Sequence, residues 1–170
     1  MLKFSKSSKK IIIEKEIDDN LANEIQSILI EYEKEDKGSI RIVINSNGGS
    51  VYPALGITDV MSFVSYPIET ECDGIAAGTA ALILAMGNKG HRYAHKNSRI
   101  AIMYAKNSEI MSLSILDEIH KLNLEIISMF AEQTNKAKHE IKTAIESAGG
   151  ELWMSAEEAK VFGIIDEIID

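Results

Sequence analysis

Apolar positions along the chain follow two spacings, and each spacing predicts a different element. Short apolar runs are typical of buried strands, whereas apolar residues three and four positions apart are typical of one helix face. The runs predict strands at residues 11–13, 40–44, 67–72, 92–94, 99–103 and 164–169. Helical spacing predicts helices that begin near residues 18, 50, 74, 113 and 155, with a short helix before Gly149. Strands that alternate with helices favour an α/β fold with right-handed crossovers.

Polar residues at the expected helix starts support several of these boundaries. Asp18 or Asp19 can cap the first helix, whose apolar face is expected to be Leu21, Ala22, Ile25, Ile28, Leu29 and Tyr32. Ser50 can cap the second helix, and Ser155 begins a capping box before the last one. Gly163 is expected to end that last helix, because glycine readily adopts the left-handed conformation found there.

The helix expected at residues 113–132 is unusually apolar around its circumference. Its apolar positions fill an arc of roughly 220° at about 100° per residue. A helix that lies on one face of a core needs an arc closer to about 100°. The surplus predicts a second buried contact for this helix, with another subunit.

Composition and charge narrow the class of protein. The 170 residues suit a single domain, with a short solvated tail at about residues 1–9. A net charge of −8 argues against nucleic acid and anionic membranes as partners. No apolar run approaches the roughly 20 residues of a membrane span, and we expect no targeting segment. The single cysteine, Cys72, cannot form an internal disulfide, which fits a cytoplasmic location.

Two glycine-containing turns lead from an expected strand into an expected helix. The first contains Asn47, Gly48, Gly49 and Ser50, and the second covers residues 74–80. Free backbone N–H groups at two such turns can meet at one point and form an oxyanion hole without any side chain. The alternative is that both are tight turns in which glycine serves the backbone alone.

The histidines offer neither a general base beside these turns nor a metal site. His120 and His139 fall on helices among charged residues, where a solvated role is expected. His91 and His95 flank a strand at the wrong spacing for a zinc-binding HExxH motif. We therefore predict no metal and no cofactor.

Four blocks of sequence resemble the ClpP-like serine proteases, the proteolytic subunits of Clp proteases. The blocks are residues 44–51, 72–81, 96–103 and 154–166, and residues 17–22 add a match near the start. In the first block the family usually has proline where Asn47 stands here. The resemblance covers about residues 10–170. It implies a ClpP/crotonase-like α/β fold of repeated ββα units, with the 113–132 helix as a protruding handle.

The same resemblance assigns the family's active-site positions to residues that lack the chemistry. The nucleophilic serine falls on Gly78, the general-base histidine on Met103 and the orienting aspartate on Glu151. Glycine has no side chain to attack a carbonyl, and methionine has no basic nitrogen. The oxyanion donors are backbone groups, which map onto Gly49 and Thr79. The chain is therefore predicted to be an inactive, ClpR-type paralogue.

The resemblance also implies partners. We expect a homo-oligomeric ring or a hetero-oligomer with an active ClpP subunit, in a structural or regulatory role. ClpP chains usually carry an axial hairpin and a helix before the first strand, and these help to dock an AAA+ unfoldase. Only about ten residues precede that strand here, so we do not expect this chain to dock an unfoldase by itself. A phage-encoded protein that caps a host ring fits the same residues.

Two other functions remain open from the residues alone. One is an active serine or threonine peptidase with a displaced nucleophile, for which Thr79, Ser46 and Ser50 are the candidates. The other is a crotonase-like enzyme that holds an acyl-CoA thioester in the oxyanion hole. The short chain and the ClpP-type blocks argue against the crotonase alternative.

Overall fold

A computed structural model describes residues 3–5, 9–34, 38–105 and 113–170, with the side chains of residues 3–5 left aside. Its strands are β1 (Lys3–Ser5), β2 (Lys10–Ile13), β3 (Ile40–Ser46), β4 (Ile68–Ala77), β5 (Arg92–His95), β6 (Arg99–Met103), β7 (Glu151–Ser155) and β8 (Glu167–Ile169). Its helices are α1 (Asp19–Glu33), α2 (Val51–Phe63), α3 (Thr79–Ala85), α4 (Leu113–Thr134), α5 (Lys138–Ser147) and α6 (Ala156–Phe162). Among the described residues, no helix is both long and apolar enough to cross a membrane.

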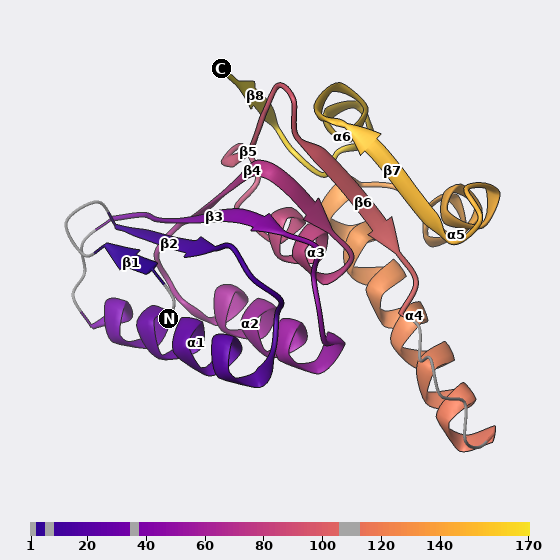
Figure 1. Cartoon of the computed structure of the whole chain (residues 1–170), viewed down its shortest axis with the longest axis horizontal. Coiled ribbons are helices and arrows are strands. Elements are labelled where there is room, and N and C mark those ends of the chain that lie inside the picture. The colour runs from indigo at the N-terminus through magenta and orange to yellow at the C-terminus, as the bar shows by residue number, and fades with distance from the viewer. Residues whose placement is uncertain (1–2, 6–8, 35–37, 106–112) are drawn as a thin grey trace.

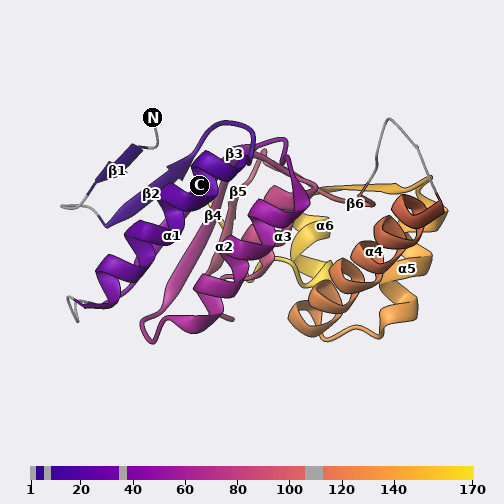
Figure 2. The same cartoon turned by 90° about the horizontal axis from the view of Figure 1, so that it is seen from below.

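The strands form one mostly parallel sheet, which confirms the α/β prediction. The main order is β1-β2-β3-β4-β5-β8, and β6 and β7 branch from β4. Among the strand pairs of the described residues, only β1–β2 and β6–β7 are antiparallel. Helices α1, α2 and α3 cover one face of the sheet, and α4 projects away from it (Figures 1 and 2). The core lies between that face and the helices, and isoleucines of β2 and β3 are fully buried there.

The local capping signals behave as expected at both ends of the chain. The Asp18 side chain accepts a hydrogen bond of 2.8 Å from the backbone N–H of Leu21 and so caps α1. Ser155 and Glu158 form the predicted capping box at the start of α6. Gly163 ends α6 in the left-handed conformation, with φ at 97°.

One boundary prediction was wrong: residues 74–77 continue β4 and do not begin a helix. The first part of β4 pairs with β5, and Ile75–Ala77 pair instead with Arg99–Ala101 of β6. The change of partner occurs at Gly74, where φ is +105°. The buried Ser98 hydroxyl holds this bend, since it donates to the Cys72 carbonyl and accepts from the Gly74 N–H. The small apolar residues 74–77, whose pattern predicted a helix, therefore form part of the strand at which the sheet branches.

Three smaller predictions also need correction. Residues 3–5 of the expected tail pair with β2 as strand β1. The last strand covers only Glu167–Ile169, and Ile164 and Ile165 are buried in the irregular segment before it. Ser50 stands at the N-cap position of α2, yet its side chain makes no capping hydrogen bond. Its backbone N–H donates to the Ile17 carbonyl instead, at 2.8 Å.

Candidate functional site

The loop between β3 and α2 is tied down by hydrogen bonds on both sides. The buried Ser46 hydroxyl donates to the Lys15 carbonyl at 2.7 Å and accepts from the Gly48 N–H at 3.1 Å. The Gly48 carbonyl accepts from the Ile17 N–H at 3.0 Å. Within the described part of the chain, the Gly49 N–H donates to no protein acceptor. A fixed loop with one free amide is the arrangement that an oxyanion donor requires.

The second junction, between β4 and α3, turns sharply at Gly78. Its φ of 56° and ψ of −120° lie in a region that residues with side chains rarely adopt. The Gly78 N–H donates to the Ala101 carbonyl at 2.9 Å, which fixes the turn against β6. A strained strand-to-helix turn of this kind exposes the nucleophile in α/β hydrolases. Gly78 has this kind of backbone geometry and carries no side chain.

The two junctions touch each other through their backbones. A Cβ atom on Gly48 would lie 2.5 Å from the Ala77 carbonyl oxygen and 3.1 Å from the Thr79 nitrogen. The Thr79 hydroxyl reaches the Gly49 carbonyl at 3.5 Å. Only glycine at position 48 permits this approach, which brings Gly49 and Thr79 to the same place.

The three positions matched to a triad also lie together. A Cβ atom on Gly78 would stand 3.9 Å from the Met103 sulfur, at ordinary contact distance. Met103 and Glu151 are direct partners across the antiparallel β6–β7 pair. The space beside Gly78 is therefore open to a side chain, and the Met103 thioether borders it, with Glu151 on the strand next to Met103.

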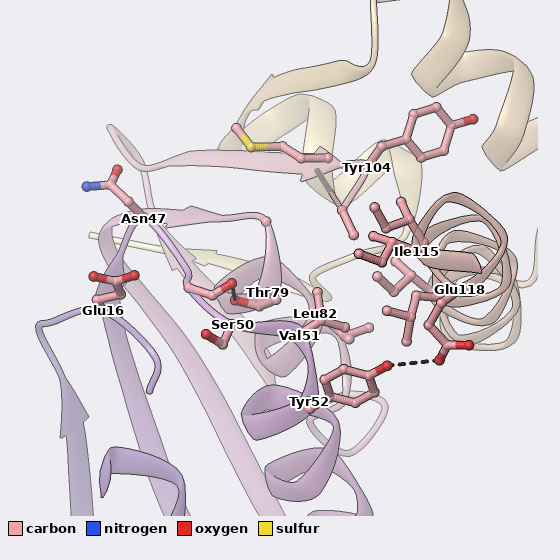
Figure 3. Close-up of a pocket in the computed structure, with 17 residues that line it drawn as sticks. Glu16, Asn47, Ser50, Val51, Tyr52, Thr79, Leu82, Tyr104, Ile115 and Glu118 are labelled. Carbon is pink, nitrogen blue, oxygen red and sulfur yellow. Dashed lines mark hydrogen bonds between the residues drawn. The ribbon is translucent and has the colours of Figure 1, made fainter. Parts of the chain in front are cut away.

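A cavity of about 670 Å³ opens over this arrangement. Gly49, Gly78, Thr79 and Met103 line its floor, and the side chains of Leu82, Ile115, Ile119, Leu122 and Ile126 supply much of its apolar wall. Figure 3 shows the cavity between the two junctions and helix α4. This volume suits a small ligand or a short peptide segment.

The three hydroxyl groups considered as alternative nucleophiles differ in how accessible they are from the cavity. Ser46 is buried, and its hydroxyl is engaged in both hydrogen bonds of the first loop. Thr79 is 7% exposed and lies over the Gly49 carbonyl. Ser50 is exposed and lines the cavity. None of the described cavity-lining residues is a histidine, lysine or arginine, and the carboxylates that line the cavity belong to Glu16 and Glu118.

The histidines lie elsewhere. His120 and His139 are exposed on α4 and α5, and His91 is exposed before β5. His95 lies on β5, with its Nε2 atom 3.3 Å from a Glu71 carboxylate oxygen. Among the described residues, no three histidine, cysteine or acidic side chains are grouped as metal ligands would be.

The single cysteine is buried beneath the bend in β4. Burial raises the pKa of the Cys72 thiol to about 12, so the thiol stays protonated and unreactive near neutral pH.

Comparison with known proteins identifies the family of this fold and turn. The family model described as Clp protease matches residues 2–170. The chain belongs to the Clp protease family. Among its relatives, the ATP-dependent Clp protease proteolytic subunit of Bacteroides fragilis is 37% identical over 164 residues, which cover 94% of this chain and 78% of that protein. The corresponding protein of Bacteroides thetaiotaomicron is 36% identical, with 94% and 73% covered. The ATP-dependent Clp protease proteolytic subunit 2 of Bacillus licheniformis is also 36% identical, with 94% and 85% covered.

Membership of the Clp protease family confirms the resemblance drawn from the four sequence blocks. The sequence did not reveal the polar rim of the cavity. Tyr52 on α2 donates a hydrogen bond of 2.8 Å to the Glu118 carboxylate on α4, and Glu16 lies at the other side of the opening (Figure 3). These residues come from segments far apart in the chain, and no local motif marks them.

Proposed function

We propose that this chain is a non-catalytic subunit of a Clp-type assembly, with a structural or regulatory role. The observation that carries the proposal is the occupancy of three adjacent positions by Gly78, Met103 and Glu151. In the family, a serine, a histidine and an aspartate are expected there.

The chemistry of those residues supports the proposal. Peptide hydrolysis by this fold needs a hydroxyl that a neighbouring base deprotonates, and then an acid that protonates the leaving amine. Gly78 has no hydroxyl, and the thioether of Met103 cannot carry a proton in either step. Glu151 has no imidazole to orient. In a serine protease with the same triad on a different fold, loss of the triad lowers turnover by about 10⁶-fold. The backbone donors at Gly49 and Thr79 would then bind a carbonyl without cleaving it.

Exposed apolar side chains on α4 support assembly with other subunits. The first half of α4 carries Leu113 at 84% exposed and Leu116 at 41% exposed, whereas Leu122, Ile126 and Phe130 further along the helix are buried. Large apolar side chains grouped on one surface mark contact sites in soluble proteins. The relatives are named as proteolytic subunits of an ATP-dependent protease. We infer a ring of this chain alone or a mixed ring with an active subunit.

Peptide hydrolysis tests the proposal directly. The purified chain is expected to release no fluorophore from a fluorogenic peptide above the rate without protein. Hydrolysis that persists through repeated purification and disappears in Thr79→Val would contradict the proposal and favour a displaced nucleophile. The Thr79→Val variant keeps the backbone N–H, so it removes the hydroxyl and leaves the oxyanion donor in place.

Isolation from the native cell tests the assembly. We expect co-purifying chains that include an active Clp proteolytic subunit, or a uniform ring of this chain. A stable monomer at micromolar concentration that captures no Clp subunit would contradict it.

A further inference from the structure

The cavity over Gly78 carries charge of one sign. Among the described residues that line it, the only carboxylates are those of Glu16 and Glu118, and no basic side chain is present. Figure 3 shows the two carboxylates on opposite sides of the cavity, with Ser50 and Thr79 between them. A ligand that lies across the cavity therefore passes both carboxylates.

We propose that Glu118 and Glu16 make this cavity selective for polypeptide segments that carry a basic side chain beside an apolar one. This preference rests on the proposed function. If the site cleaved such a segment, it would release the products and would not hold the segment bound.

Glu118 is held at the rim in a defined position. Its Oε1 atom accepts the hydrogen bond from the Tyr52 hydroxyl, across a sequence separation of 66 residues. That hydrogen bond is the main reason why the pKa of the Tyr52 hydroxyl is raised, so the hydroxyl is protonated and able to donate at neutral pH. The nearby Lys121 ammonium is paired with Asp117 at 2.6 Å. The second carboxylate oxygen of Glu118 can therefore accept from an ammonium or guanidinium group of a ligand.

The rest of the lining selects an extended segment over other ligands. The free N–H groups of Gly49 and Thr79 can receive a backbone carbonyl, and Leu82, Leu122 and Ile126 offer an apolar wall for the adjoining side chain. A free carboxylate, such as a peptide C-terminus or a fatty acid, would meet two like charges and no described counter-charge. Like charges at short range are unfavourable, so an internal peptide carbonyl fits better than an anionic group.

Binding of matched peptides tests this preference. Acetylated and amidated apolar heptapeptides, labelled with a dye and differing at one position as Lys, Gln or Glu, are titrated with the protein and followed by fluorescence anisotropy. The variable position is placed on each side of the apolar anchor in turn. At low salt we expect the Lys peptide to bind about threefold to tenfold more tightly than the Glu peptide. We expect this ratio to shrink at 0.5 M salt, where the screening length is short.

Three variants locate the source of the preference. Glu118→Gln is expected to remove most of the Lys-to-Glu ratio, and Tyr52→Phe to reduce it by less, since the carboxylate remains but loses its hydrogen bond. Glu157→Gln is the matched control, because it changes net charge equally at an exposed position on α6 outside the cavity. All these side chains are exposed, so thermal unfolding should be unchanged.

Three outcomes of the titrations would contradict the proposed preference. Equal affinity for the Lys and Glu peptides, no binding of either, or an equal effect of Glu157→Gln and Glu118→Gln would each overturn the preference. The last of these would assign it to the overall negative charge. Mass spectrometry of the peptides after titration checks the proposed function separately, because cleaved peptides would contradict that function whatever the ratio.

Discussion

The strand-to-helix junctions and the β6–β7 pair contribute to the same site in opposite ways. The junctions supply backbone: a strained turn at Gly78 and two amides at Gly49 and Thr79, fixed by hydrogen bonds to Ile17, Lys15 and Ala101. The β6–β7 pair should supply the side chains of acid–base chemistry, and it carries Met103 opposite Glu151. The first region offers free backbone amides beside a strained turn, and the second places a thioether next to that turn with a carboxylate on the neighbouring strand.

The difference has a physical cause. The backbone geometry is needed for folding, since close approach at Gly48 and the branch of β4 hold the sheet and α3 together. The side chains of Met103 and Glu151 are only partly buried, and Met103 lines the cavity, so substitution at these two positions costs less stability. The side chains at positions 103 and 151 can therefore change while the backbone of the two junctions keeps its geometry.

Restoring the side chains should have the largest effect. Gly78→Ser alone is expected to stay inactive, because Met103 cannot take a proton from the serine hydroxyl. The triple variant Gly78→Ser/Met103→His/Glu151→Asp is expected to hydrolyse a fluorogenic peptide at least about 10²-fold faster, since triad members act as a unit. The space beside Gly78 accepts a Cβ atom, although φ at this turn costs a serine about 1–3 kcal/mol.

Two results would show why the triple variant fails to behave as expected. Gly78→Ser with the same activity as the triple variant would show that Met103 does not occupy the position of the lost base. A folded triple variant that reacts with no serine-directed probe would show that the turn does not present its hydroxyl.

Disturbing the backbone should have the next largest effect. Gly48→Ala would place a methyl group 2.5 Å from the Ala77 carbonyl oxygen at a φ of +92°. Strain and overpacking together are expected to lower the free energy of unfolding by about 3–5 kcal/mol. Gly90→Ala is the control: its φ is +88° and a Cβ atom there meets nothing within 4 Å, so about 1–2 kcal/mol is expected. Urea denaturation measures both, and equal losses would mean that the contact between the junctions contributes nothing.

An ion pair far from the site provides a smaller effect on stability. Arg92 is only 4% exposed and pairs with Asp166 at 2.6 Å. Burial alone would raise the pKa of Asp166, but hydrogen bonds and charge from Arg92 hold it below its usual value. Asp166→Asn is expected to lower the free energy of unfolding by about 2 kcal/mol at pH 7.

The sign of the pH dependence follows from that lowered pKa. The pair stabilises the folded chain above the unfolded pKa of the carboxyl group, about 3.9, and this stability is lost as pH falls through the folded pKa. Denaturation midpoints of the unaltered chain should therefore drop more below pH 4 than those of Asp166→Asn. Glu167→Gln, an exposed neighbour on β8, serves as the control. Identical acid profiles for Asp166→Asn and the unaltered chain would exclude this role for the pair.

Changes on the first half of α4 should affect stability least. Leu113→Gln/Leu116→Gln is expected to change the free energy of unfolding by less than about 0.5 kcal/mol, because both side chains are exposed. The same variant should shift sedimentation towards smaller species if this surface joins subunits. If the variant sediments as the unaltered chain does, the contact between subunits must lie on another part of the molecule.

Local signals explain which parts of the fold could be predicted. The caps at Asp18 and Ser155 and the stop at Gly163 depend on neighbours within a few residues, and each was confirmed. The extension of β4 to Ala77 depends on β6, more than twenty residues later, so small apolar residues were taken for helix. The Tyr52–Glu118 bond joins two elements that no pattern brings together. The positions of Gly78, Met103 and Glu151 could be aligned from sequence, but their contact required the fold.

Reaction with a fluorophosphonate probe tests the central claim most directly, because the probe attaches only to an activated hydroxyl. The intact mass of the unaltered chain is measured after incubation, with an active serine protease as the positive control. We predict no added mass on this chain. An adduct at Thr79, Ser50 or Ser46 would contradict the account, since it would show that the site still activates a nucleophile.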